Sequence, residues 1–238
     1  MAVTKTVGAM PMYLFLVIYV VLTTGLPAAW HSQRHGVISA TQVALAFFLG
    51  LNAIVCVWEM CLFFQIDLIE RKHATYSEKF KGKALKIAYQ FFTLGVGLSN
   101  VFTSELWAEV WATYSVFDPS YANRQSFGFF VDVGNGFTTL LPTLVFMCGM
   151  TAHGSGGFEL PLSARNLGVL GMVSFYQEFY GTCIYFLSFI LNRRYKNLKA
   201  HEIVIFVCFT NGLWFFLPLL GMKASWDLIQ TDSFDTFL

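Results

Sequence analysis

Residues 127–150 have the sequence FGFFVDVGNGFTTLLPTLVFMCGM, and this stretch decides the class of fold. A helix that crosses a bilayer needs about 20 mostly apolar residues, and the run is long enough. Its one charged residue is Asp132, which Asn135 follows three positions later. A carboxyl group in the middle of a bilayer is costly, so such a residue faces other helices or a cavity. The stretch therefore predicts a membrane-spanning helix that carries part of a polar site.

The composition of the whole chain indicates the same class. Of 238 residues, 56% are hydrophobic and 12% are charged, with a formal net charge of +1 and a mean hydropathy of +0.58. A soluble domain is about one quarter charged, and a disordered chain combines low hydrophobicity with high net charge, so neither class fits. The near-neutral charge argues against a nucleic-acid partner. We expect an all-α polytopic membrane bundle. We expect no metal and no cofactor, because no Cys/His cluster has metal spacing.

Six apolar segments account for most of the chain, at residues 12–30, 40–68, 87–103, 127–150, 167–191 and 203–222. The third is short and relatively polar. Ten of the 15 Lys and Arg residues lie in two stretches, 70–86 and 193–199. These stretches are on the same side of the membrane only if the third segment does not span it. Cytoplasmic loops are rich in Lys and Arg. We therefore predict five transmembrane helices and a cytoplasmic N-terminus. The third segment is then re-entrant or interfacial, half-buried between the second and fourth.

Further polar residues lie inside these segments. Two more carboxylates, Glu59 and Glu178, are placed where lipid would be expected. Residues three or four positions apart share a face of a helix. In the fifth segment this spacing groups Gln177, Tyr180 and Gly181, and Tyr185 lies four positions beyond Gly181. In the last segment it groups Asn211 and Trp214.

If these faces converge, they line one cavity with carboxyl, amide and indole groups. A neutral carboxylic acid can give a proton to one carbon of an apolar substrate, and a carboxylate can remove a proton from another. A cation that develops on the substrate would be stabilised by the ring face of Trp214. The alternative is that the polar groups only form hydrogen bonds between helices. That alternative is weakest for Asp132, since a structural role rarely needs a carboxylate, and Glu178 is left open between the two.

Three ordered blocks of the sequence resemble the emopamil-binding protein family. The first comprises VWATY (110–114), DPSY (118–121) and DVGN (132–135). The second is QEFYGTCIYFL (177–187), and the third is NGLWFFLP (211–218). The blocks fall within residues 106–222, about half of the chain, which is similar to the family's EXPERA domain.

The resemblance implies a five-helix membrane fold whose cavity opens to the bilayer, and a location in the endoplasmic reticulum. Known members are a sterol isomerase that moves a ring double bond, and the sigma-two receptor, which binds sterols and amphiphilic amines. By this resemblance Asp132 takes the place of the family's acid on the middle helix, and Asn135 that of a Thr. Asn211 and Trp214 match the residues that help to hold the cationic intermediate.

One part of the isomerase pattern differs. The isomerase has a His-x-x-x-Glu pair on an earlier helix, whereas Glu59 is preceded four positions earlier by Val55. Segment 87–103 offers only Asn100, with Ser104 four residues on. The altered pair disfavours the sterol 8-to-7 reaction itself and leaves acid–base chemistry on another isoprenoid. The dipeptide Trp58-Glu59 is also similar to a Trp-Glu pair in small fungal membrane terpene cyclases.

Three functions remain, in order of preference. The first is an enzyme that isomerises or cyclises a sterol or other isoprenoid. Its catalytic candidates are Glu59, Asp132, Asn135, Asn211 and Trp214. Its ligand-binding candidates are Trp58, Gln177, Glu178, Tyr180 and Tyr185. The second is a non-catalytic sterol- or lipid-binding or trafficking protein, and the third is a structural subunit of a membrane complex. The expected partners are a sterol-like or isoprenoid ligand and membrane lipids, and a homodimer is left open. We divide the chain into N-terminal transmembrane segments with a basic loop (1–105), an EXPERA-like domain (106–222) and a short tail (223–238).

Overall fold

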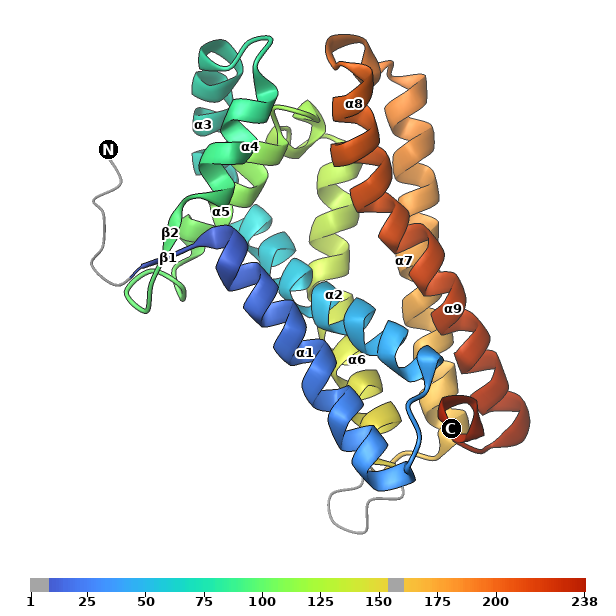
Figure 1. Ribbon diagram of the computed structural model, residues 1–238. Helices are drawn as coiled ribbons and strands as arrows, with labels where there is room; N and C mark the ends of the chain where they lie inside the picture. The colour runs from blue at the N-terminus through green and yellow to red at the C-terminus, as the bar shows by residue number, and fades with distance from the viewer. Residues whose placement is uncertain (1–8, 154–160) are drawn as a thin grey trace.

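The computed structural model describes residues 9–153 and 161–238, most of which are helical (Figure 1). In chain order, the elements are β1 (Met10–Pro11), α1 (Met12–His35), α2 (Ala40–Phe64), α3 (Ile66–Lys79), α4 (Ala84–Phe92), β2 (Gly95–Val96), α5 (Ser104–Tyr114), η1 (Pro119–Ala122), α6 (Phe127–Ala152), α7 (Ala164–Leu191), η2 (Arg194–Asn197), α8 (Ala200–Glu202), η3 (Ile203–Phe209), α9 (Thr210–Thr231) and η4 (Asp235–Phe237).

Three of the long helices begin at serine caps that the sequence supplies. The hydroxyl oxygen of Ser126 accepts a hydrogen bond from the backbone N–H of Phe129 at 3.1 Å, at the start of α6. Ser39 and Ser163 cap α2 and α7 in the same way. A side-chain oxygen at this position satisfies one of the N–H groups that a helix leaves unpaired at its start.

Four helices are long and apolar enough to cross a membrane: α1, α2, α6 and the continuous rod of α8, η3 and α9 from Ala200 to Thr231. The prediction of an all-α protein with membrane-spanning helices is confirmed at this level. The fifth predicted span, α7, is 28 residues long but is not among these four. It carries Gln177 and Glu178 and lies along α9.

Helix α1 has the surface of a helix that faces lipid. Of its 24 residues, only Met12 and His31 are buried. Large apolar side chains along it are widely exposed, including Val17 at 55%, Val21 at 61% and Leu26 at 65%. Water would make this surface an aggregation hazard, whereas hydrocarbon solvates it.

Close helix packing fixes the centre of the bundle. Helix α2 packs against α6, and α7 packs against α9. At Gly136 in α6, a Cβ atom would lie 2.7 Å from the Cβ of Glu59 and 2.9 Å from the carbonyl oxygen of Cys56, both in α2. Only glycine allows this approach, because ordinary contacts with a Cβ begin at about 3.4 Å. The contact also fixes the position of Glu59 in the bundle.

Residues 87–103 do not form a spanning helix. Helix α4 has nine residues and is about 14 Å long, less than half the thickness of a bilayer core. The chain then turns through β2, which pairs antiparallel with β1, and continues into α5. The expected position between the second and fourth apolar segments is wrong: α4 packs against α5 and α1 instead. Four polar or glycine residues at 93, 95, 97 and 99 break the apolar run there.

The two basic stretches lie at the same end of the molecule. Figure 1 shows α3 and α4 at the upper end, together with the connection between α7 and α8. The C-terminus lies at the opposite end. This arrangement is the one that the positive-inside argument requires.

The expected short tail from residue 223 is also wrong. Helix α9 continues to Thr231, and the segment after it folds back onto the bundle. Phe237 is fully buried in the cluster that contains Phe146 and Leu228. The expected domain boundary at residue 105 falls inside helix α5. Helices α2 and α6, which lie on either side of this boundary in the sequence, pack against each other. The described residues therefore form one bundle.

Candidate functional site

A cavity of about 340 Å³ lies inside the bundle, within the size range of small-molecule sites. Side chains from α2, α5, η1, α6, α7 and the junction of η3 and α9 line it. The lining is mostly apolar or aromatic, with a few convergent polar groups. This composition suits a hydrophobic ligand that makes a small number of polar contacts.

Three carboxyl groups, from three helices, line this cavity: Glu59 on α2, Asp132 on α6 and Glu178 on α7. Glu59 is 5% exposed and Glu178 is 3% exposed, while Asp132 is half-buried. No Lys, Arg or His is among the described residues that line the cavity. The acids therefore have no cationic partner there, and a group that gains positive charge in the cavity would be stabilised.

Glu178 is held in place by two amides. The side-chain N–H groups of Asn52 and Asn135 donate to its two carboxyl oxygens, at 3.2 Å and 3.4 Å respectively. The carbonyl oxygen of Asn52 in turn accepts from the indole N–H of Trp214 at 2.8 Å. This chain of bonds joins α2, α6, α7 and α9 and fixes the orientation of the Trp214 ring.

Glu59 and Asp132 differ from Glu178 in this respect. No amide holds either carboxyl group among the described residues, and the polar side chain beside Asp132 is the hydroxyl group of Tyr121. Both carboxyl groups line the cavity and can face a ligand there. Two such acids beside the fixed carboxyl group of Glu178 are a suitable set for moving a proton.

Aromatic rings form much of the remaining wall. The indole N–H of Trp111 donates to the backbone oxygen of Trp58 at 2.6 Å, which joins α5 to α2. The ring of Tyr121 lies 5.0 Å from that of Trp111 and 5.1 Å from that of Tyr114. Burial raises the pKa of Tyr114 to about 12 and that of Tyr121 well above its usual range. Both tyrosines therefore remain neutral near pH 7.

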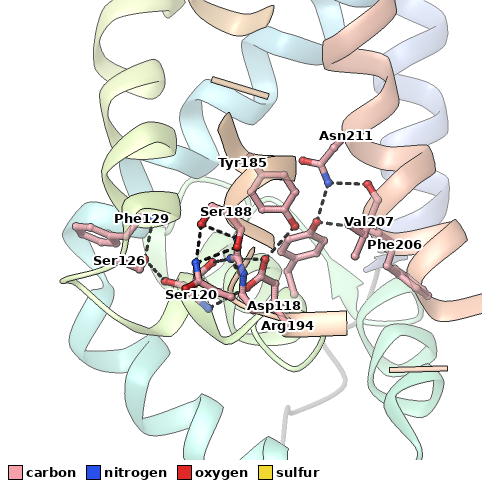
Figure 2. Close-up of polar contacts among 12 residues, drawn as sticks. Asp118, Ser120, Ser126, Phe129, Tyr185, Ser188, Arg194, Phe206, Val207 and Asn211 are labelled. Carbon is pink, nitrogen blue, oxygen red and sulfur yellow. Dashed lines mark hydrogen bonds and ion pairs between the residues drawn. The ribbon is translucent and has the colours of Figure 1, made fainter. Parts of the chain in front are cut away.

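A polar network lies behind Tyr185 of the cavity wall (Figure 2). Asp118 is fully buried, and the Arg194 guanidinium donates to its carboxyl oxygens at 2.7 Å and 2.8 Å. The hydroxyl group of Tyr185 donates to the same carboxylate at 2.9 Å. The network thus ties the loop before α6 to the end of α7 and fixes the Tyr185 ring in the cavity wall.

A π-helical turn brings the last helix to the site. In η3, from Ile203 to Phe209, the hydrogen-bond ladder carries an extra residue per turn, and such turns are frequent at functional sites. The hydroxyl group of Tyr114 donates to the backbone oxygen of Phe206 at 2.9 Å, in that turn. The amide of Asn211 donates to the hydroxyl oxygen of Tyr114 at 3.0 Å and to the oxygen of Val207 at 2.9 Å. Asn211 is therefore positioned by α5 and by its own helix.

Eight of the ten site residues predicted from the sequence line the cavity, and their chemical roles remain predictions. They are Trp58, Glu59, Asp132, Asn135, Glu178, Tyr185, Asn211 and Trp214.

The other two do not line it. Gln177 donates to the side-chain oxygens of Asn135 at 2.9 Å and Thr138 at 2.7 Å, so it positions Asn135 from behind. Tyr180 is 52% exposed and stacks on Tyr176 along the outer face of α7, so its expected place in the site is wrong. Tyr180 stands two positions from Glu178, which puts the two side chains on different faces of the helix.

Sequence reasoning left out Asn52 and the aromatic residues of α5 and η1. Asn52 precedes Glu59 by seven residues, two helical turns, so the spacing could have placed both on one face. Trp111, Tyr114 and Tyr121 belong to VWATY (110–114) and DPSY (118–121), which carry part of the family resemblance but lie outside the four spanning helices. A polar residue inside an apolar span is therefore not the signal that identifies them.

Comparisons with other proteins do not assign this site. No protein-family model, no curated protein and no solved structure matches the chain. The function must therefore be inferred from the geometry of the cavity.

Proposed function

We propose that the chain is a five-span, EXPERA-like membrane protein that binds a sterol-like or other isoprenoid ligand in the cavity and moves a proton on it. The observation that carries the proposal is the pair of carboxyl groups, Glu59 and Asp132, in an aromatic cavity that has no basic side chain among its described lining residues. The fifth span in this proposal is α7, which supplies Glu178 and Tyr185 to the same cavity.

The chemistry needs one acid and one base on a single substrate. A protonated carboxyl group gives its proton to an alkene carbon, and the π electrons form the new C–H bond, which leaves a cation on the neighbouring carbon. The ionised carboxylate then removes a proton from an adjacent carbon, and that C–H pair forms the shifted double bond. The proton count is unchanged, and attack of a second alkene on the cation before the proton is lost would close a ring.

The aromatic wall is suited to the intermediate of such a reaction. Ring faces of Trp, Tyr and Phe attract a cation, most strongly when water is excluded. Trp214 is held by Asn52, and Tyr185 is held by Asp118, so both rings are oriented before a ligand binds. Preorganised groups of this kind stabilise developing charge without reorganisation.

A hydrophobic ligand also has a route from the lipid. An apolar groove of about 900 Å³ lies between the start of α2 and the last rod, and Phe209 and Leu213 line both the groove and the cavity. The position of the isomerase His is taken by Val55, which lines the cavity and cannot relay a proton. The groove suits any hydrophobic ligand, whereas Val55 in place of the His favours an isoprenoid handled by carboxyl groups alone over the sterol 8-to-7 reaction.

A non-catalytic binder is the second candidate, because three carboxyl groups without a cation would equally hold a permanently cationic ligand. The two functions differ in what the acids do. An enzyme with Asp132→Asn should keep its ligand and lose turnover, whereas a binder of cations should lose the ligand.

The experiment uses the lipid that co-purifies with the full chain. The protein is purified in mild detergent, incubated in D₂O, and the lipid is extracted for mass spectrometry. We expect a sterol-like or isoprenoid species that gains deuterium with the wild type and with the exposed control Asp235→Asn. With Asp132→Asn or Glu59→Gln, the same species should be retained without deuterium. Retention without exchange in the wild type would support the binder, and recovery of bulk phospholipid alone would contradict both and favour a structural subunit.

A further inference from the structure

Three histidines that the cavity does not use meet at the end of the bundle that carries the C-terminus. They are His31 and His35 near the end of α1 and His153 directly after α6. One ring nitrogen of each lies within 4.8 Å of the others. Their ring centres are 4.6 Å apart for His31 and His35, and 4.5 Å apart for His35 and His153. The sequence predicts no metal site, because no Cys/His cluster along the chain has metal spacing; His153 joins the other two only in the fold.

The local sequence explains half of this arrangement. His31 and His35 are four residues apart, so they occupy one face of α1, one turn from each other. That i, i+4 pair is a spacing that two metal ligands on a helix use. The packing of α1 along the bundle then brings the pair to the end of α6.

The hydrogen-bonding state of the rings points to a ligand. His31 is fully buried, and neither of its ring nitrogens has a partner among the described residues. The Nε2 atoms of His35 and His153 also lack partners. Each buried polar group left unpaired costs about 1–3 kcal/mol. A cluster needed only for packing would be better served by phenylalanine, which carries no such penalty.

His153 is oriented as a metal ligand usually is. Its Nδ1 lies 3.0 Å from the backbone oxygen of Met150, so the N–H of that tautomer donates there and the lone pair on Nε2 is free. Metal-binding histidines commonly give their second N–H to a carbonyl in this way. The His153 ring also stacks on Phe234 with centres 4.5 Å apart, which holds it from the other side.

We infer that His31, His35 and His153 form a three-histidine site for a divalent transition-metal ion such as Zn²⁺. Zn–N bonds of about 2.0–2.1 Å in a tetrahedral site place the nitrogens about 3.4 Å apart, so side-chain rotations that draw the rings together would complete it. Three imidazoles favour zinc, copper or nickel over magnesium and calcium, which prefer oxygen ligands. A fourth position remains for water. The bound ion would clamp the end of α1 to the end of α6.

The test is metal titration of the full chain in detergent, purified with an affinity tag that contains no histidine and stripped with a chelator. We expect one Zn²⁺ per chain, and with Co²⁺ the visible absorption of a tetrahedral nitrogen site. His35→Gln and His153→Gln should each weaken binding at least about tenfold, since even changes to groups behind the ligands cost about 10- to 100-fold. Mg²⁺ should not compete.

Two matched controls keep the result decisive. His73→Gln and His201→Gln replace histidines outside the cluster and should leave stoichiometry and affinity unchanged. The half-buried His35 gives the primary result, because its substitution disturbs the packing least. His31 is buried, so metal binding by His31→Gln is compared only if the variant has the elution volume and the unfolding temperature of the wild type. No zinc binding by the folded wild type, or equal binding by His35→Gln and the controls, would overturn the inference.

Discussion

Gly136→Ala tests whether the contact between α2 and α6 builds the site. A Cβ at this position would lie 2.7 Å from the Cβ of Glu59, 2.9 Å from the oxygen of Cys56 and 3.0 Å from the nitrogen of Met60. Two of these neighbours are backbone atoms, which cannot rotate away. To restore ordinary contact near 3.4 Å, the two helices must separate locally by about 0.7 Å.

The magnitude follows from that separation. Overpacking of this kind costs about 1–3 kcal/mol, partly offset by the gain of about 1 kcal/mol when alanine replaces glycine in a helix. The matched control is Gly134→Ala on the same helix, where a Cβ meets nothing within 4 Å. Gly134→Ala should therefore be neutral or slightly stabilising. Relative to it, Gly136→Ala should unfold several degrees lower, since 1 kcal/mol shifts Tm by about 2–4 °C in a chain of this size.

The functional effect should exceed the loss of stability. The contact moves Glu59 itself, and a displacement near 1 Å can cost about 100-fold in a reaction that depends on placement. The assays are thermal unfolding in detergent and deuterium exchange into the co-purified lipid. If Gly136→Ala and Gly134→Ala match in both assays, the proposed role of this contact in placing the acid is refuted.

Three further outcomes are expected from other parts of the structure. Arg194→Leu should cost about 3–5 kcal/mol, because the buried Asp118 carboxylate loses its counter-ion; an unchanged Tm would contradict this. Folded Tyr114 titrates near pH 12, above its unfolded value of about 10, so its contribution is complete below pH 10 and is lost as pH rises toward 12. Unfolding measured across that range should show a smaller decline in Tyr114→Phe, and an identical decline would refute the assignment. Phe237→Ala should cost about 3–5 kcal/mol, whereas Phe216→Ala, 69% exposed, should cost little; equal effects would show that the C-terminal segment is not docked.

The sequence alone was sufficient for the class of protein and for most of the helices. Runs of apolar residues between serine caps and polar breaks determine where a helix can begin and end, and these signals are local. The carboxyl groups of Glu59, Asp132 and Glu178 could be singled out for the same reason, since a charged group inside an apolar run is expensive unless it faces other protein or a cavity. The sequence also predicted that the two basic stretches, 70–86 and 193–199, share one end of the bundle, because the positions of Lys and Arg in the loops can be read directly from the sequence.

Only the tertiary structure decided which of these residues meet. Asn52 joins Trp214 and Glu178 through hydrogen bonds that cross three helices, and no spacing along the chain encodes them. The turn that residues 87–103 make from α4 through β2 depends on contacts with α1, and the sequence alone placed this apolar run incorrectly between the second and fourth segments. His153 reaches His31 and His35 only because α1 and α6 end at the same level of the bundle. Local sequence selects helices, whereas packing between distant helices, set by close contacts such as Gly136, selects the site.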